Sequence, residues 1–169
     1  MFVNRPAVLA LATGLTLALS GGFAFAADTT VHVSLWDKGP DSVNVDDAHT
    51  KMMGKMDMAM MKTAQMGVKL DQTTVKAGTV TFAVTNDSKD IIHEMILSPL
   101  KAGVTELPYL PDEYRIDEEK AEHLGEVSEL DPGKMGSLTV DLKPGTYIIY
   151  CNIPGHFFDG MWTTMTVTP

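Results

Sequence analysis

The chain has 169 residues, of which 44% are hydrophobic, and a formal net charge of −9 at pH 7. Nucleic acids and anionic lipid surfaces repel such an acidic chain, so this balance argues against both as partners and favours basic proteins. The single cysteine, Cys151, excludes an intramolecular disulfide, which leaves a free thiol or a metal ligand as its role.

The N-terminus has the three parts of a secretory signal peptide. One positive charge, Arg5, precedes an apolar run over residues 7–19, and Ala24-Phe25-Ala26, with small residues on both sides of Phe25, provides a cleavage site. Polar residues and glycines interrupt the apolar run, and a membrane-spanning helix needs roughly 20 continuous apolar residues. We therefore expect cleavage after Ala26, export to a bacterial periplasm, and a mature chain over residues 27–169 that forms one domain without a membrane span.

The mature chain is predicted to be all-β. Residues 30–36 alternate in polarity, which places Val31, Val33 and Leu35 on one face and His32 on the opposite, surface face. Further strand-like runs occupy residues 66–70, 79–85, 91–97, 126–130, 135–142, 145–150 and 162–167, with Gly- and Pro-containing turns between several of them. Short strands at this spacing indicate an antiparallel β-sandwich or barrel.

Residues 40–66 interrupt this pattern with a methionine-rich insertion, predicted to be helical or a loop. Seven of the twelve methionines lie here, and leucine and isoleucine are absent. A core helix uses leucine and isoleucine before methionine, whereas soft, neutral thioethers prefer copper(I). The candidate ligands of such a secondary copper(I) site are His49, Met52, Met53, Met56, Met58, Met60, Met61 and Met66. The alternative is an insertion that covers the apolar surface of the sandwich without binding metal.

A second polar segment, residues 98–124, is expected to contain a loop followed by a short acidic helix or turn. Glu118, Glu119 and Glu122 are expected on its solvated side, and His123 on the same surface. We interpret this acidic run as a hydrated face, and the alternative is a docking site for a basic partner.

The most specific pattern lies between the last two predicted strands. Four residues separate Cys151 from His156 and four more separate His156 from Met161, with Pro and Gly in the gaps that let the chain turn back twice. A thiolate, an imidazole and a thioether select copper, and two histidines, a cysteine and a weak axial methionine make a blue copper site. The pattern predicts a copper loop that needs a second histidine. The alternative is a buried structural thiol beside a surface histidine and a core methionine.

This loop resembles the C-terminal copper loop of the cupredoxins, the family of plastocyanin, azurin and rusticyanin. Its Cys-x4-His-x4-Met spacing looks most like the rusticyanin-like branch. Residues 75–86, followed by Ile92-His93-Glu94, are similar to the strand pair that delivers the first copper histidine, and the turns at 130–134 and 142–147 resemble those before the copper loop. The resemblance spans about residues 68–167. It implies a Greek-key β-sandwich or barrel and one type 1 copper bound by His93, Cys151, His156 and Met161.

The resemblance also implies how electrons enter and leave. His156 would lie near the surface as the electron port. From their position in the sequence, Asn152 and the backbone near Asn86 are expected to donate hydrogen bonds that tune the sulfur and hold the loop. A transient redox partner, a cytochrome or another copper protein, would dock on an apolar patch formed by Ile153, Pro154, Phe157 and Phe158.

Two functions remain open from the sequence. The first is a periplasmic one-electron carrier that cycles between copper(I) and copper(II). The second is a resistance protein that sequesters or oxidises copper(I), because the methionine-rich insertion resembles Met/His-rich extensions of cupredoxins linked to copper tolerance. A multicopper oxidase or nitrite reductase is disfavoured because the five histidines include no His-x-His pair, and one cysteine excludes a binuclear centre with two thiolates. We expect a carrier, with oxidation of copper(I) left open, rather than an enzyme.

Overall fold

The computed structural model describes residues 29–43, 54–56 and 62–169 of the chain. The predicted signal peptide lies outside the described residues, as do His49, Met52, Met53, Met58, Met60 and Met61 of the methionine-rich insertion. Among the described residues, no helix is long and apolar enough to cross a membrane.

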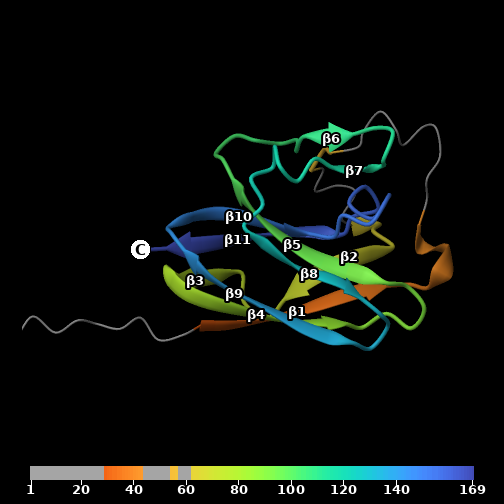
Figure 1. Ribbon diagram of the computed structural model, residues 1–169, viewed down its shortest axis with the longest axis horizontal. Coiled ribbons are helices and arrows are strands. Elements are labelled where there is room, and N and C mark those ends of the chain that lie inside the picture. Colours follow the sequence, from red (N-terminus) through yellow and green to blue (C-terminus); the bar gives the residue numbers. More distant parts are fainter. Residues whose placement is uncertain (1–28, 44–53, 57–61) are drawn as a thin grey trace, which may run out of the picture.

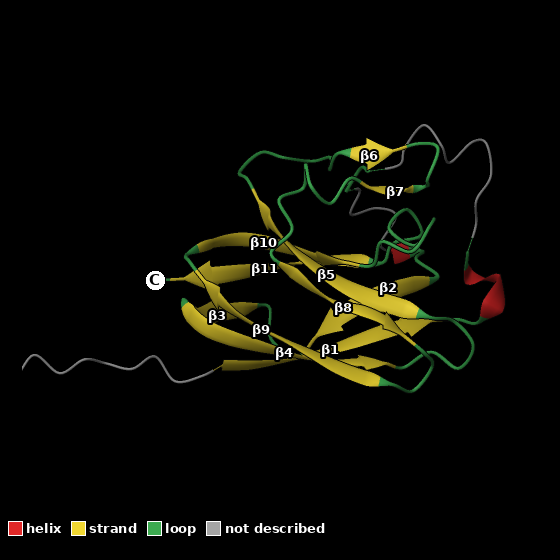
Figure 2. Cartoon of the chain, viewed as in Figure 1, coloured by secondary structure: helices red, strands yellow, loops and turns green. Residues whose placement is uncertain are grey.

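Two large β-sheets packed face to face form the body of the described part of the chain, and a two-stranded sheet lies outside them (Figures 1 and 2). The first sheet has the strand order β2-β1-β4-β9, with β1 (Thr29–Asp37), β2 (Met66–Leu70), β4 (Gly78–Asn86) and β9 (Met135–Leu142). The second has the order β3-β11-β10-β5-β8, with β3 (Thr74–Lys76), β5 (His93–Leu100), β8 (Gly125–Leu130), β10 (Gly145–Tyr150) and β11 (Trp162–Thr168). The predicted all-β sandwich is confirmed.

Alternation along the strands builds the core between the two sheets. In β4, Val80, Phe82 and Val84 are fully buried while the residues between them are half-buried, as a strand with one inward face requires. His32 is exposed on the outer face of β1, as predicted. Two strand pairs are parallel, β1 with β4 and β3 with β11, which corrects the expected antiparallel sheet. The long stretches of chain between the members of each pair make a parallel crossover possible.

Residues 98–124 cover the outer face of the second sheet, where the sequence predicted a hydrated loop and helix or turn. This segment forms a short hairpin, β6 (Tyr109–Leu110) with β7 (Arg115–Ile116), followed by turns, and the described residues contain no α-helix. Strands β5 and β10 are therefore buried on both faces, and alternate residues serve two hydrophobic clusters. The outer cluster contains Ile96, Leu107, Ile116, Ala121, Ile148, Tyr150, Phe157 and Trp162.

The strand directions bring five strand ends together at one end of the sandwich. Strands β1, β4 and β10 end there, and β5 and β11 begin there, because β1 runs parallel to β4 while β10 runs antiparallel to both β5 and β11. The chain also forms a 3₁₀ turn, Pro40–Ser42, just after β1. The predicted copper ligands lie at this end.

Candidate metal centre

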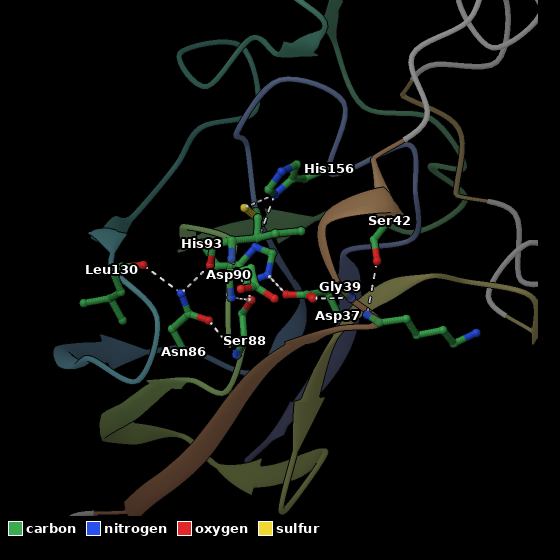
Figure 3. Close-up of polar contacts among 12 residues, drawn as sticks. Asp37, Gly39, Ser42, Asn86, Ser88, Asp90, His93, Leu130 and His156 are labelled. Atoms are coloured by element: carbon green, nitrogen blue, oxygen red, sulfur yellow. Dashed lines mark hydrogen bonds and ion pairs between the residues drawn. The ribbon is translucent and has the colours of Figure 1, made fainter.

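Three of the four predicted ligands meet at a single point. His93 is the first residue of β5, Cys151 directly follows β10, and His156 lies in the loop between β10 and β11. Their nearest ligand atoms all lie within 4.8 Å of one another. His156 Nδ1 is 3.3 Å from His93 Nδ1 and 3.4 Å from Cys151 Sγ (Figure 3).

Backbone hydrogen bonds close the loop that carries Cys151, His156 and Met161. The Cys151 N–H donates to the Met161 carbonyl at 3.0 Å, and the Met161 N–H donates to the His156 carbonyl at 3.0 Å. Gly155 and Gly160 take the left-handed φ values of 87° and 99° that the predicted turns need. A side chain at Gly160 would also collide with Ala64, since an added Cβ would lie 2.7 Å from the Ala64 Cβ. Met161 itself is fully buried, and its backbone is fixed next to the site.

The four predicted ligands fit copper, and burial shields them from water. His93, Cys151 and Met161 are fully buried, and His156 is 2% exposed. Burial raises the pKa of the Cys151 thiol to about 12. Burial, followed by the neighbouring His93, lowers the pKa of His156 to about 3, and burial also lowers the pKa of His93. The site thus offers two neutral imidazoles with facing Nδ1 atoms and a buried sulfur. Such soft to borderline ligands suit a copper ion.

The hydrogen bonds around the sulfur differ from the expected ones. The Glu94 N–H donates to Cys151 Sγ at 3.5 Å, and a backbone hydrogen bond from Ile153 also lowers the pKa of the thiol. Asn152 was expected to tune the sulfur, but its N–H instead donates to the Glu94 carboxylate at 3.0 Å. Near Asn86, the side-chain amide donates to the carbonyls of Ile91 and Leu130, and the backbone N–H donates to the Lys134 carbonyl at 2.9 Å.

Asn152 does hold the loop, through its side chain. Its Oδ1 accepts a hydrogen bond from the Ile116 N–H at 2.6 Å, and its Nδ2 donates to the Ile116 carbonyl at 3.0 Å. The same amide donates to the carboxylate of Glu118 at 2.7 Å, so half-buried Glu118 is not part of a fully solvated face as predicted. Glu119, Glu122 and His123 are exposed.

Asp37 is a residue of the site that the sequence did not reveal. Its Oδ2 lies 2.8 Å from His93 Nε2, on the side of the ring opposite the ligand cluster (Figure 3), and its side chain is 2% exposed. Burial raises the pKa of Asp37, but hydrogen bonds from Ser88, His93 and the Gly39 N–H outweigh burial and hold it below its usual value. An aspartate before a Gly-Pro turn is common in any loop, so the sequence carried no signal for this contact.

The predicted docking patch and electron port need correction. Phe157 is 1% exposed and Phe158 8%. Phe157 is buried in the outer cluster, which includes residues of the 98–124 segment, and it packs edge-on against Tyr150 and stacks on Trp162. His156 is also buried rather than near the surface. Of the predicted patch, only Pro154 is exposed and Ile153 half-buried.

Two of the predicted copper(I) ligands lie in the described part of the chain. Met66 is fully buried in the core between the sheets, the same cluster that contains Cys151 and Met161, and its role as a copper(I) ligand stays a prediction. Met56 is half-buried against the outer cluster, and its N–H donates to the Thr105 carbonyl at 2.9 Å.

The chain is similar to a protein family, to the sequence of a known protein and to solved structures. The sulfocyanin (SoxE) domain family matches residues 127–169, which contain Cys151, His156 and Met161. Auracyanin-B from Chloroflexus aurantiacus is 49% identical over 41 residues, which are 24% of this chain and 17% of that protein, so the match spans less than a fifth of the relative.

One of the similar solved structures shows the same fold. Auracyanin from Roseiflexus castenholzii superposes with a TM-score of 0.50 at 21% identity, over 85% of this chain and 100% of that one. Rusticyanin from Thiobacillus ferrooxidans gives a TM-score of 0.48 at 18% identity, over 84% of this chain and 79% of the other.

Proposed function

We propose that the activity of this protein is one-electron transfer. The chain has the cupredoxin fold and the ligand set of a type 1 copper site, His93, Cys151, His156 and Met161. The observation that carries this proposal is the convergence of two imidazoles and one thiol sulfur, all buried and with ligand atoms within 4.8 Å of one another, at the end of a β-sandwich. These ligands suit copper, and a single copper ion changes oxidation state by one electron.

The chain contributes rigidity and the exclusion of water. A bound copper ion would supply the redox chemistry through alternation between copper(I) and copper(II). His93 is fixed by β5 and by Asp37, while the copper loop is fixed by backbone bonds and by the Asn152 side chain. Ligands held in one arrangement rearrange little between the two oxidation states, which favours fast electron exchange. Burial of all four ligands keeps water from the site and favours a high reduction potential.

We further propose a periplasmic location and a setting in copper tolerance. The location is supported by the signal-peptide pattern over residues 1–26, and the setting by the methionine-rich composition of residues 40–66. The redox partner we propose is a soluble one-electron protein that binds transiently. A second candidate function, capture or oxidation of copper(I), rests on the same methionine composition.

The first experiment titrates the purified protein with copper(II) and records the bound copper and the thiolate-to-copper absorption together. We expect one copper(II) per chain with an intense visible band, and no such band in Cys151→Ala. Met135→Leu is the matched control, because Met135 is 71% exposed on β9 and should leave the band unchanged. A wild-type protein without the band, or a Cys151→Ala variant that retains it, would contradict the proposed site.

A copper(I) titration separates the two candidate functions. It compares the wild type with a variant in which Met52, Met53, Met56, Met58, Met60 and Met61 are leucine, while Met66 is kept because it fills the core. Copper(I) bound beyond one equivalent by the wild type and lost in the variant favours copper handling. Identical stoichiometry of one in both proteins favours a simple carrier.

A further inference from the structure

We propose that Asp37 is a positioning residue for copper: its carboxylate fixes the proton of His93 on Nε2, leaves Nδ1 free for the metal, and favours copper(II) over copper(I). This inference rests on the proposed blue copper function, which it deepens by naming a group that sets the reduction potential without touching the metal.

The geometry around His93 carries the first step. A neutral imidazole has one N–H donor and one acceptor nitrogen, and the partner of one nitrogen decides the state of the other. Asp37 Oδ2 lies 2.8 Å from Nε2, so this nitrogen must carry the proton and donate it. Nδ1 then presents a lone pair, and it faces His156 Nδ1 at 3.3 Å, inside the ligand cluster.

The surroundings of Asp37 carry the second step, because the other groups that hydrogen-bond its carboxylate are also donors. Oδ1 accepts a hydrogen bond from the Gly39 N–H at 2.7 Å, which fixes the turn after β1. The Ser88 hydroxyl also hydrogen-bonds the carboxylate. Since Ser88 Oγ already accepts the N–H groups of Asp90 at 3.1 Å and Ile91 at 2.8 Å, its own proton is free to point at Asp37. The turn uses one oxygen of Asp37, and the other remains for His93.

The placement of Asp37 depends on the fold rather than on its local sequence. Strand β1 runs parallel to β4, so the end of β1 lies beside the loop that leads from β4 to His93. The side chains of Asp37 and His93 are 2% and 0% exposed, so little water screens the carboxylate from the site. A negative charge on the far side of a ligand imidazole makes that imidazole a stronger electron donor, which stabilises the more highly charged copper(II).

The test replaces Asp37 by asparagine, which keeps the size of the side chain and removes its charge. We expect Asp37→Asn to bind copper(II) about 10- to 100-fold more weakly, to bind copper(I) with a smaller loss, and so to have a higher reduction potential in a redox titration of the visible band. Asp87→Asn is the matched control: it removes one charge from the exposed residue at the end of β4, where Asp87 accepts a hydrogen bond from Ser34 instead of a copper histidine. Equal shifts of the potential in the two variants would overturn the proposal.

A second measurement does not depend on a folded variant or on copper. Nitrogen-15 NMR of the histidine rings in the metal-free wild-type protein reports which nitrogen of His93 carries the proton. We expect the Nε2–H form, and observation of the Nδ1–H form would overturn the role of Asp37. Because this readout needs no copper, it also separates the two proposals: a protein without a blue band would refute the carrier function and leave the Asp37 result to be judged by itself.

Discussion

Glu94 is a half-buried acid that lies directly beside the metal ligands. It follows His93 in the chain, its N–H donates to Cys151 Sγ, and its carboxylate accepts the N–H of Asn152. Burial, countered by that hydrogen bond and reinforced by the charges of Glu118 and Glu126, raises the pKa of Glu94 from 4.5 to about 7. Glu94 therefore titrates close to neutral pH in the metal-free protein.

The pH dependence of the metal-free protein follows from Glu94 and His156 acting with opposite sign. Between pH 4.5 and 6.5 the folded protein holds a proton on Glu94 that the unfolded chain has released, so this group makes stability fall as pH rises. Over the same range the unfolded chain protonates His156 while the folded protein does not, because the folded pKa is about 3 and the ordinary value is 6.5; this makes stability rise with pH. His93, whose pKa burial also lowers, acts in the same direction as His156, so the slope due to Glu94 offsets part of the slope due to the two histidines.

Replacing Glu94 by glutamine should expose the slope due to His156 and His93. In metal-free Glu94→Gln, the free energy of unfolding should rise with pH between 4.5 and 6.5 more steeply than in the wild type, by about 1.4 kcal/mol per pH unit at most. Urea denaturation at several pH values measures this. Glu113→Gln, which removes an exposed carboxylate in the turn between β6 and β7, is the control and should retain the wild-type profile. Parallel profiles for wild type and Glu94→Gln would show that Glu94 is already ionised in this range.

At the scale of the element, the copper loop is attached to the hairpin β6–β7 through one side chain. Asn152 makes two hydrogen bonds to the backbone of Ile116 and a third to Glu118. Ile116 is 1% exposed, so water does not replace a lost partner there. The loop consequently depends on residues 98–124, which lie far from it in the sequence.

Removal of this attachment should destabilise the protein measurably. Asn152→Ala leaves the buried Ile116 N–H without an acceptor, at a cost of about 1–3 kcal/mol in the free energy of unfolding. Thr139→Ala is the control: Thr139 pairs with Thr81 on the exposed face of the first sheet, and its loss should cost within about 0.5 kcal/mol. Urea denaturation of the two metal-free variants gives the comparison, and equal stability of both would mean that Asn152 does not hold the loop.

The residues that the sequence predicted and those it missed differ in how their role is encoded. Cys151, His156 and Met161 can be predicted from the sequence, because soft ligands at equal spacing with Pro and Gly between them are rare outside copper loops. Asp37 is an ordinary acid at a strand end, and its contact with His93 depends on the parallel pairing of β1 with β4, which alternation of polarity does not show. Local patterns therefore reveal the ligands but not their supporting residues.

The buried aromatic residues illustrate the same limit for whole elements. Phe157 and Phe158 looked like a docking patch because the loop is apolar and the family places such a patch there. The burial of Phe157 depends on residues 98–124 packing over the second sheet, and the sequence of that segment is largely polar. The strand pattern predicted the sandwich correctly, because each sheet has an inward face and its strands therefore alternate in polarity. A segment that covers the outer face of a sheet has only scattered apolar residues, which form no such pattern.

At the scale of the whole molecule, the formal charge of −9 should govern the encounter with a redox partner. An acidic surface attracts a basic one-electron protein over distances comparable with the Debye length, which is about 10 Å at 0.1 M salt. Stopped-flow mixing of the copper(I) protein with an oxidised basic carrier should give a second-order rate constant that falls about tenfold or more between low and high salt. A small neutral oxidant is the control, because its rate should not change with salt. A basic carrier that reacts no faster than an acidic one at low salt would show that local contacts near Pro154 and Ile153, rather than net charge, select the partner.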